Sequence, residues 1–181
     1  MLSQFSDEDG NPGLGTVFKL PKGVYPVGRL DLDSEGLLIL TNDKALNYKL
    51  LDPKYGHERT YWVEVEGKPT REELDQLSRG VAINVGGKPY HTLPAVVEPV
   101  DVSIPEREPP VNRAKHPETC WLSITLTEGK NRQVRKMTAK IGHPTLRLLR
   151  VSIEQVNLFP MQPGDLKMIS RNALYKKLGL D

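Results

Sequence analysis

Cysteine is nearly absent from the chain, since Cys120 is the single thiol among 181 residues. An internal disulfide is therefore excluded, and such cysteine usage is typical of a reducing compartment, so we expect the cytoplasm. The four histidines are scattered and show no metal-ligand spacing with Cys120. No apolar run approaches membrane-spanning length, and no stretch has the pattern of a signal peptide. We therefore expect neither a metal site nor a membrane partner.

An excess of charge of one sign is also lacking, because the formal net charge is only +2. Overall charge therefore says little about nucleic acid, and its distribution matters instead. One strip is unbalanced, since residues 129–153 contain seven Lys or Arg and no acid. A strip of this kind attracts phosphate. The alternative is an ordinary solvated helix face, where basic clusters are also common.

The predicted elements are mostly strands, interrupted irregularly by helices, which indicates an α+β protein with a mixed, largely antiparallel sheet. Apolar runs and alternation predict strands at 24–27, 37–40, 58–66, 81–85, 92–102, 119–127, 146–153 and 166–169. Capping residues and helical spacing predict helices at 43–51, 70–80, 131–141 and 170–178. Two polar segments, 1–15 and 105–117, are predicted to be exposed loops.

Local chemistry adds detail to several of these elements. Asp43 is expected to cap the first helix, with Ala45 facing inward. Thr70 and Glu73 are expected to form a capping box at the second helix. Alternation in 58–66 places Glu64 on the face opposite the apolar residues.

The stretch 28–41 changes from a charged loop to an apolar run. Arg29, Asp31, Asp33 and Glu35 stand just before residues 37–40, which read as a buried strand. Packing does not require charges there, because charges beside a buried strand must be paired or solvated. A polar turn that carries caps is the alternative, since connecting and functional loops look alike in composition.

A longer pattern extends from this stretch along most of the chain. Its segments are Gly28-Arg29-Leu30-Asp31, Asp33-Ser34-Glu35-Gly36-Leu37-Leu38, Leu40-Thr41-Asn42-Asp43, Arg59-Thr60-Tyr61-Trp62-Val63 and Glu128-Gly129-Lys130-Asn131-Arg132-Gln133-Val134-Arg135-Lys136-Met137. The pattern resembles the RNA pseudouridine synthases, in the branch that includes the ribosomal small-subunit pseudouridine synthase A family. Within the branch it is most similar to the large-subunit ribosomal pseudouridine synthase E group.

The resemblance implies the pseudouridine synthase fold, an extended sheet with a central cleft and flanking helices. We expect a single catalytic domain over 1–181, without a separate N-terminal RNA-binding domain. The family's first strand and a Lys-Pro-containing loop precede the point where this sequence begins, so we expect that strand to be missing.

The resemblance also implies a reaction, the isomerisation of a uridine in RNA to pseudouridine. The C1′–N1 bond breaks and a C1′–C5 bond forms, without redox change or net hydrolysis, so no cofactor is expected. By resemblance Asp31 is the catalytic carboxylate, a role that carboxylates fill in other glycosidic chemistry. Asp33 and Glu35 are competitors that fall outside the matched position. The target base must be flipped out of its stack.

Two further side chains have implied roles in the reaction. Arg135 resembles the family's arginine that pairs with the aspartate, which would keep the carboxylate ionised despite desolvation. A phosphate contact is the alternative for Arg135. Tyr61 resembles the active-site tyrosine, whose ring can stack on uracil and whose oxygen could assist removal of the C5 proton. An ordinary core tyrosine on an alternating strand is the alternative.

The remaining candidates concern RNA binding. Arg29 is expected to enter the space left by the flipped base. Contacts to phosphate are expected from Lys130, Arg132, Lys136 and Lys140. Leu148 is a candidate for the apolar floor under the uracil, or else ordinary core. The expected partner is 23S ribosomal RNA or a pre-ribosomal particle, and the protein is expected to be a monomer. One alternative is the same chemistry on transfer RNA. The other is a non-catalytic RNA-binding or ribosome-assembly protein on this fold.

Overall fold

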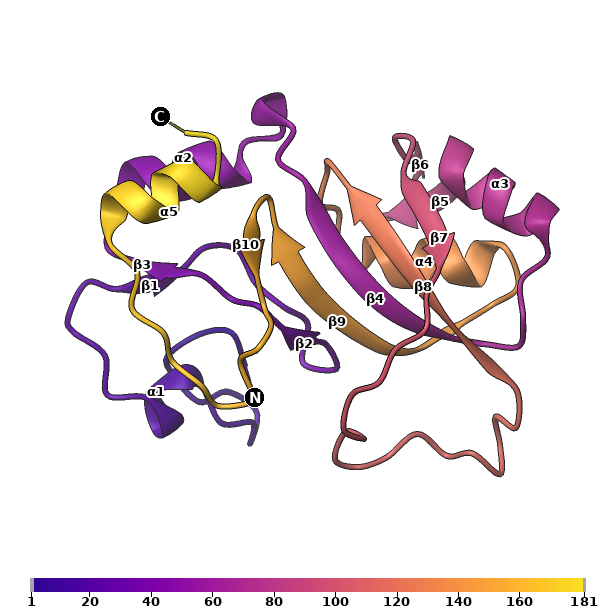
Figure 1. Ribbon diagram of the computed structural model, residues 1–181, viewed down its shortest axis with the longest axis horizontal. Helices are drawn as coiled ribbons and strands as arrows, with labels where there is room; N and C mark the ends of the chain where they lie inside the picture. The colour runs from indigo at the N-terminus through magenta and orange to yellow at the C-terminus, as the bar shows by residue number, and fades with distance from the viewer. Residues whose placement is uncertain (1, 181) are drawn as a thin grey trace. The chain divides into compact units, whose positions relative to one another are not determined.

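The computed structural model describes residues 2–180, and it is an α+β structure in which the chain forms two compact units (Figure 1). The first unit contains the residues up to His57 together with those from Arg150 onward. The second contains residues Glu58–Leu149. No helix in the described part of the chain is long and apolar enough to span a membrane.

The second unit is built on an antiparallel sheet. Strand β4 (Arg59–Glu66) pairs along its whole length with β8 (Thr119–Leu126), and β7 (Val96–Pro99) pairs with the other edge of β8. Strand β9 (Thr145–Ile153) follows β4 in the sheet order. Alternation along β4 and β8 sends one set of side chains into the core, since Val63 and Leu122 face each other in the register and are both fully buried.

Two helices and a hairpin cover the core of this unit. They are α3 (Arg71–Arg79), α4 (Gln133–Lys140) and the hairpin of β5 (Ala82–Val85) with β6 (Lys88–His91). The predicted capping box is confirmed, because the Thr70 side chain accepts from the Glu73 amide and Glu73 accepts from the Thr70 amide. Leu148 belongs to this core and is 6% exposed, which supports its packing role.

The first unit is organised around short pairings. Strand β1 (Tyr25–Pro26) pairs with β3 (Leu40–Thr41), while β2 (Glu35–Gly36) and β10 (Val156–Asn157) pair with β9. Its other elements are α1 (Leu14–Val17), α2 (Lys44–Leu51), the 3-10 helix η1 (Pro53–Tyr55) and α5 (Arg171–Lys177). Leu46, Leu50 and Leu178 are almost fully buried in its core.

Asp43 caps α2 as predicted, and it also ties this helix to α5. Its carboxylate accepts from the Ala45 and Leu46 amides and from the side chains of Arg171 and Tyr175. The hydrogen bond from Tyr175 and the Leu46 amide lower the pKa of Asp43, because they stabilise its charged form. Ser170 caps α5 as predicted, through the Ala173 amide.

Four expectations about the elements are wrong. The apolar run 37–40 is not a continuous strand, because residues 37–39 lie between β2 and β3 and belong to neither. The segment 166–169 is not a strand, and Met168 is 94% exposed. The range 92–102 contains only the four residues of β7, since β6 ends before it. Ala45 is exposed, because only Leu46 and Leu50 of α2 face the core.

The structure adds burial at Glu64 and corrects the expected exposure of one segment. Glu64 was assigned to the face opposite Val63 and Val65, and its side chain there is 1% exposed, since Arg113 and Thr119 donate hydrogen bonds to its carboxylate. The segment 1–15 is more than an exposed loop, because Ser3 and Leu14 are buried and α1 begins within it. The loop 105–117 is largely exposed as predicted, although Val111 is buried.

Cys120 is half-buried on β8 and is a free thiol. Burial raises the pKa of this thiol, because desolvation disfavours the thiolate. The sequence predicted a small packed side chain at this position, and Cys120 packs against the core of the second unit.

Candidate active site and nucleic-acid interface

The loop that carries Asp31 is held by its own backbone and by β9. The Ser34 amide donates to the Asp31 carbonyl over 2.9 Å, which closes a turn over residues 31–34. Arg150, buried in the first unit, accepts from the Leu37 amide with its carbonyl and donates from Nε to the Leu37 carbonyl. Gly36 lies against this strand so closely that a Cβ would stand 2.4 Å from the Arg150 carbonyl oxygen. The loop therefore has a defined conformation on the C-terminal side of Asp31.

Within this loop the proposed groups differ in exposure. The side chain of Asp31 is half-buried, whereas Arg29 is exposed to solvent. Asp33 is exposed and Glu35 is half-buried, so burial separates Asp33 from the other two acids. An exposed arginine two residues from a half-buried carboxylate fits the predicted division between contact with RNA and chemistry.

Tyr61 lies on β4, where its register partner on β8 is Ile124. Its side chain is half-buried and packs against the core of the second unit. Trp62 is the next residue and is also half-buried, on the opposite face of the strand. Tyr61 therefore contacts the core while part of its side chain stays accessible to solvent.

Helix α4 separates its apolar face from its basic residues. Val134, Met137 and Ile141 are buried, as the spacing predicted. Arg135 is half-buried, and its Nη1 donates to the Thr145 carbonyl oxygen over 3.4 Å. Arg132 stands at the N-cap in the left-handed region with φ 51°, and its side chain is exposed. The two arginines therefore differ in exposure to solvent, since Arg135 is half-buried and Arg132 is exposed.

The turn before α4 contains a buried carboxylate that the sequence reasoning missed. Glu128 is 5% exposed and accepts from the Tyr90 hydroxyl, the Leu93 amide and Gln133 Nε2. The bond to Glu128 raises the pKa of Tyr90, because it stabilises the neutral phenol that donates it. Lys130 Nζ lies 4.8 Å from the Tyr90 ring centroid, a cation–π distance. These hydrogen bonds and the cation–π contact hold the turn at the start of the basic strip, residues 129–153.

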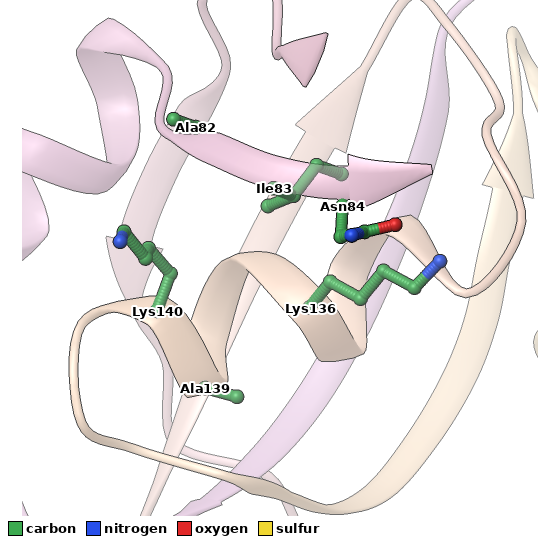
Figure 2. Close-up of a pocket in the computed structure, with 6 residues that line it drawn as sticks. All are labelled: Ala82, Ile83, Asn84, Lys136, Ala139 and Lys140. Atoms are coloured by element: carbon green, nitrogen blue, oxygen red, sulfur yellow. The ribbon is translucent and has the colours of Figure 1, made fainter. Parts of the chain in front are cut away.

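A hollow of about 400 Å³ lies between α4 and β5 (Figure 2). Its lining residues are Ala82, Ile83, Asn84, Lys136, Ala139 and Lys140. Lys136 and Lys140 flank the hollow from one side of α4, and Asn84 points toward it from β5 (Figure 2). Lys136 Nζ also donates to Asn131 Oδ1 over 3.4 Å. The structure therefore brings two of the predicted phosphate ligands to one concave surface.

The predicted site residues are divided between the two units. Arg29 and Asp31 belong to the first unit, whereas Tyr61, Arg135 and the cations of the strip belong to the second. Among residues 2–180, no group of three or more His, Cys, Asp or Glu side chains is arranged to hold a metal ion. The predicted site residues themselves carry carboxylates, guanidiniums, ammoniums and one phenol.

Residues 16–140 match the family model described as RNA pseudouridylate synthase. The chain belongs to this family. A ribosomal large subunit pseudouridine synthase E from Vibrio parahaemolyticus is 50% identical over 93% of this chain and 69% of its own length. One from Xanthomonas axonopodis pv. citri is 48% identical over 90% of this chain and 85% of its own length. A ribosomal large subunit pseudouridine synthase B from Bacillus subtilis is 34% identical over 94% of this chain and 64% of its own length.

A solved structure has a similar fold. A crystal structure of a pseudouridylate synthase matches 97% of this chain and 68% of its own, with a TM-score of 0.78 and 23% sequence identity. This RNA pseudouridylate synthase therefore has the predicted pseudouridine synthase fold in the α+β class. The assignments of individual side chains stay predictions.

Proposed function

We propose that this pseudouridine synthase converts a uridine of large-subunit (23S) ribosomal RNA, free or in a pre-ribosomal particle, to pseudouridine. The observation that carries the proposal is the identity of 48–50% to synthases named for the large ribosomal subunit, over at least 90% of the chain. We propose that the protein acts as a monomer in the cytoplasm, where this RNA is found. Both units carry groups assigned to the reaction, so we propose that they work as one catalytic domain.

The proposed reaction is balanced without a further reactant. The uracil detaches as the C1′–N1 bond breaks, turns, and reattaches through C5. The C5 proton leaves and N1 gains one, so atoms and charge are conserved. Asp31 is assigned as the nucleophile that starts detachment, a carboxylate role with parallels in glycosidic chemistry. The turn closed by the Ser34 amide supports this assignment, because a nucleophile must be held in one orientation.

Arg135 and Tyr61 are assigned to the same reaction. A desolvated carboxylate needs a cation to stay ionised, and Arg135 is proposed to supply it. The half-buried position of its side chain supports this, because a poorly hydrated guanidinium interacts more strongly with a carboxylate than an exposed one does. Tyr61 is proposed to stack on the flipped uracil and to assist removal of the C5 proton.

RNA binding is assigned to cations that are exposed or half-buried. Arg29 is proposed to fill the space of the flipped base, because a planar guanidinium stacks on bases. Lys130, Arg132, Lys136 and Lys140 are proposed as phosphate ligands. The hollow between α4 and β5 supports the last two, because its flanking ammonium groups suit a phosphodiester strand (Figure 2).

The catalytic assignment is tested with Asp31→Asn, which removes the charge and keeps the shape of the side chain. We expect pseudouridine formation to be abolished, while RNA affinity stays within about tenfold, roughly 1.4 kcal/mol. Turnover is measured by chromatography of the nucleosides from digested RNA. Asp33→Asn is the matched control and should keep most of the activity. Retained turnover in Asp31→Asn, or its loss only in Asp33→Asn, would refute the assignment.

The substrate is tested separately by mapping pseudouridine in ribosomal and transfer RNA from cells with and without the gene. A site lost from large-subunit RNA supports the proposal. A site lost from transfer RNA instead would change the substrate, and no lost site would favour a binding role without catalysis.

A further inference from the structure

The N-terminal segment of the first unit is folded by contacts within itself. The Asp7 carboxylate accepts from the Gly13 amide over 2.8 Å and from the Thr16 hydroxyl over 2.7 Å. The Leu14 amide donates to the Gln4 carbonyl over 2.7 Å. These bonds join the start of the segment to α1. Residues 2–17 therefore form a small folded element of their own.

Glycine makes this element possible. A Cβ at Gly13 would stand 2.5 Å from the Ser6 carbonyl oxygen, and one at Gly15 would stand 2.7 Å from the Phe5 carbonyl oxygen. No side chain fits at such distances, so the backbone of residues 13–15 packs directly on that of residues 5–6. The contact holds the run of residues 2–6, which begins the segment, in one position.

This run carries Ser3, whose hydroxyl makes two hydrogen bonds to the same residue. It donates to the Leu30 carbonyl oxygen and accepts from the Leu30 amide, each over 2.9 Å. Ser3 is 8% exposed, so water competes little for these bonds. The partners are 27 positions apart in the sequence, so this is a tertiary contact that no local turn requires.

Leu30 is the residue before Asp31, and its two polar groups belong to the two peptide planes that flank it. The amide lies in the plane shared with Arg29, and the carbonyl lies in the plane shared with Asp31. A hydroxyl bound to both planes restricts the rotation that would swing the Asp31 side chain. The Ser34 amide holds the next carbonyl, that of Asp31 itself. The backbone of Asp31 is thus fixed from both sides.

We propose that Ser3 is a positioning residue for the catalytic loop, and that the N-terminal segment acts as a clasp that orients Asp31 toward the target nucleotide. The inference rests on the role assigned to Asp31 in the proposed function. It predicts a loss of turnover without a comparable loss of RNA binding, because the clasp, residues 2–17, is proposed to act through the loop and not through contact with the substrate.

The test compares Ser3→Ala, which removes both bonds, with Ser3→Thr, which keeps the hydroxyl. Ser6→Ala is the matched control, because Ser6 lies in the same segment and is exposed. Single-turnover rates and RNA affinity are measured for each variant, together with hydrogen exchange of the Leu30 amide and the melting temperature. If Ser3→Ala does not fold, Ser3→Cys replaces it, because a thiol is nearly the same size and a weak hydrogen-bonding group.

We expect Ser3→Ala to lower the single-turnover rate by about tenfold to a hundredfold, since a small displacement of a reacting group has effects of that size. RNA affinity should stay within about twofold, a free-energy change of less than about 0.5 kcal/mol, the Leu30 amide should exchange faster, and Ser3→Thr should recover most of the rate. A normal rate despite faster exchange would overturn the positioning role, and unchanged exchange would overturn the clasp. If Asp31→Asn keeps its activity while Leu30 exchange still responds to Ser3→Ala, the proposed function fails and the clasp remains as a structural contact only.

Discussion

At the scale of single residues, the side chains whose burial sequence patterns do not predict are those with distant polar partners. Glu64 stands on the polar face of an alternating strand, yet its carboxylate is buried with Arg113, 49 residues further along the chain. Alternation assigns a face but carries no information about a guanidinium contributed by a loop. Arg113 also binds Glu106, so this one arginine anchors a segment that composition describes only as exposed. The same limit explains why Glu128 and Ser3 were missed.

The pair between Arg113 and Glu64 gives a stability prediction. Arg113→Ala leaves a buried carboxylate without its cation and should lower the free energy of unfolding by about 1–3 kcal/mol. Arg71→Ala is the matched control, because its partner Asp75 and its own side chain are exposed, and it should have little effect. Urea unfolding measures both. Adding Glu64→Gln to Arg113→Ala should recover part of the loss, and equal losses in the two single variants would contradict the explanation.

A second prediction at this scale separates the two roles assigned to Tyr61. Tyr61→Phe keeps the ring and removes the hydroxyl, so RNA affinity should be retained while turnover falls about a hundredfold, the usual size of a proton-transfer contribution. Tyr61→Leu should lower both, because stacking is lost as well. Binding and single-turnover assays distinguish them. Turnover at the wild-type rate in Tyr61→Phe would leave the hydroxyl without a chemical role.

At the scale of helices and strands, the sequence predicted best where the determining contacts are local. The capping box of α3 and the caps of α2 and α5 join residues three positions apart or less, so propensity and spacing determine them. The runs 37–40 and 166–169 are both apolar, but a strand also needs a partner for its backbone. The Leu37 amide donates to β9, but residues 37–39 are not part of a strand, and residues 166–169 have no ladder among the described pairings. A short apolar run does not reveal whether such a partner exists.

The basic helix gives a prediction about RNA binding. Arg132→Gln removes one exposed charge at the start of α4 and keeps a polar side chain there. If Arg132 contacts a phosphate, the slope of log affinity against log salt concentration should become shallower by about one unit. Lys176→Gln on α5 is the matched control, because Lys176 is an exposed helical cation outside the strip. An unchanged slope for Arg132→Gln, or an equal change for Lys176→Gln, would remove Arg132 from the phosphate ligands.

At the scale of the whole molecule, motif resemblance carried more information than composition did. A net charge of +2 and an ordinary hydrophobic fraction are compatible with most functions, whereas the segments around Asp31, Tyr61 and Arg135 predicted the family and the fold that the comparisons support. The resemblance did not predict that the chain divides into two compact units, with Asp31 in one and the other two residues in the second. Such a division depends on the density of tertiary contacts, which motifs of a few residues do not encode.

The lone thiol on β8 has a practical consequence for studying that division. Because Cys120 is half-buried and its thiolate is disfavoured, we expect the natural chain to react little with maleimide dyes. Cysteines introduced at exposed surface positions, one in each unit, would therefore accept a donor and an acceptor dye selectively. Energy transfer between them would report, in solution, whether the spacing of the units changes when RNA arrives.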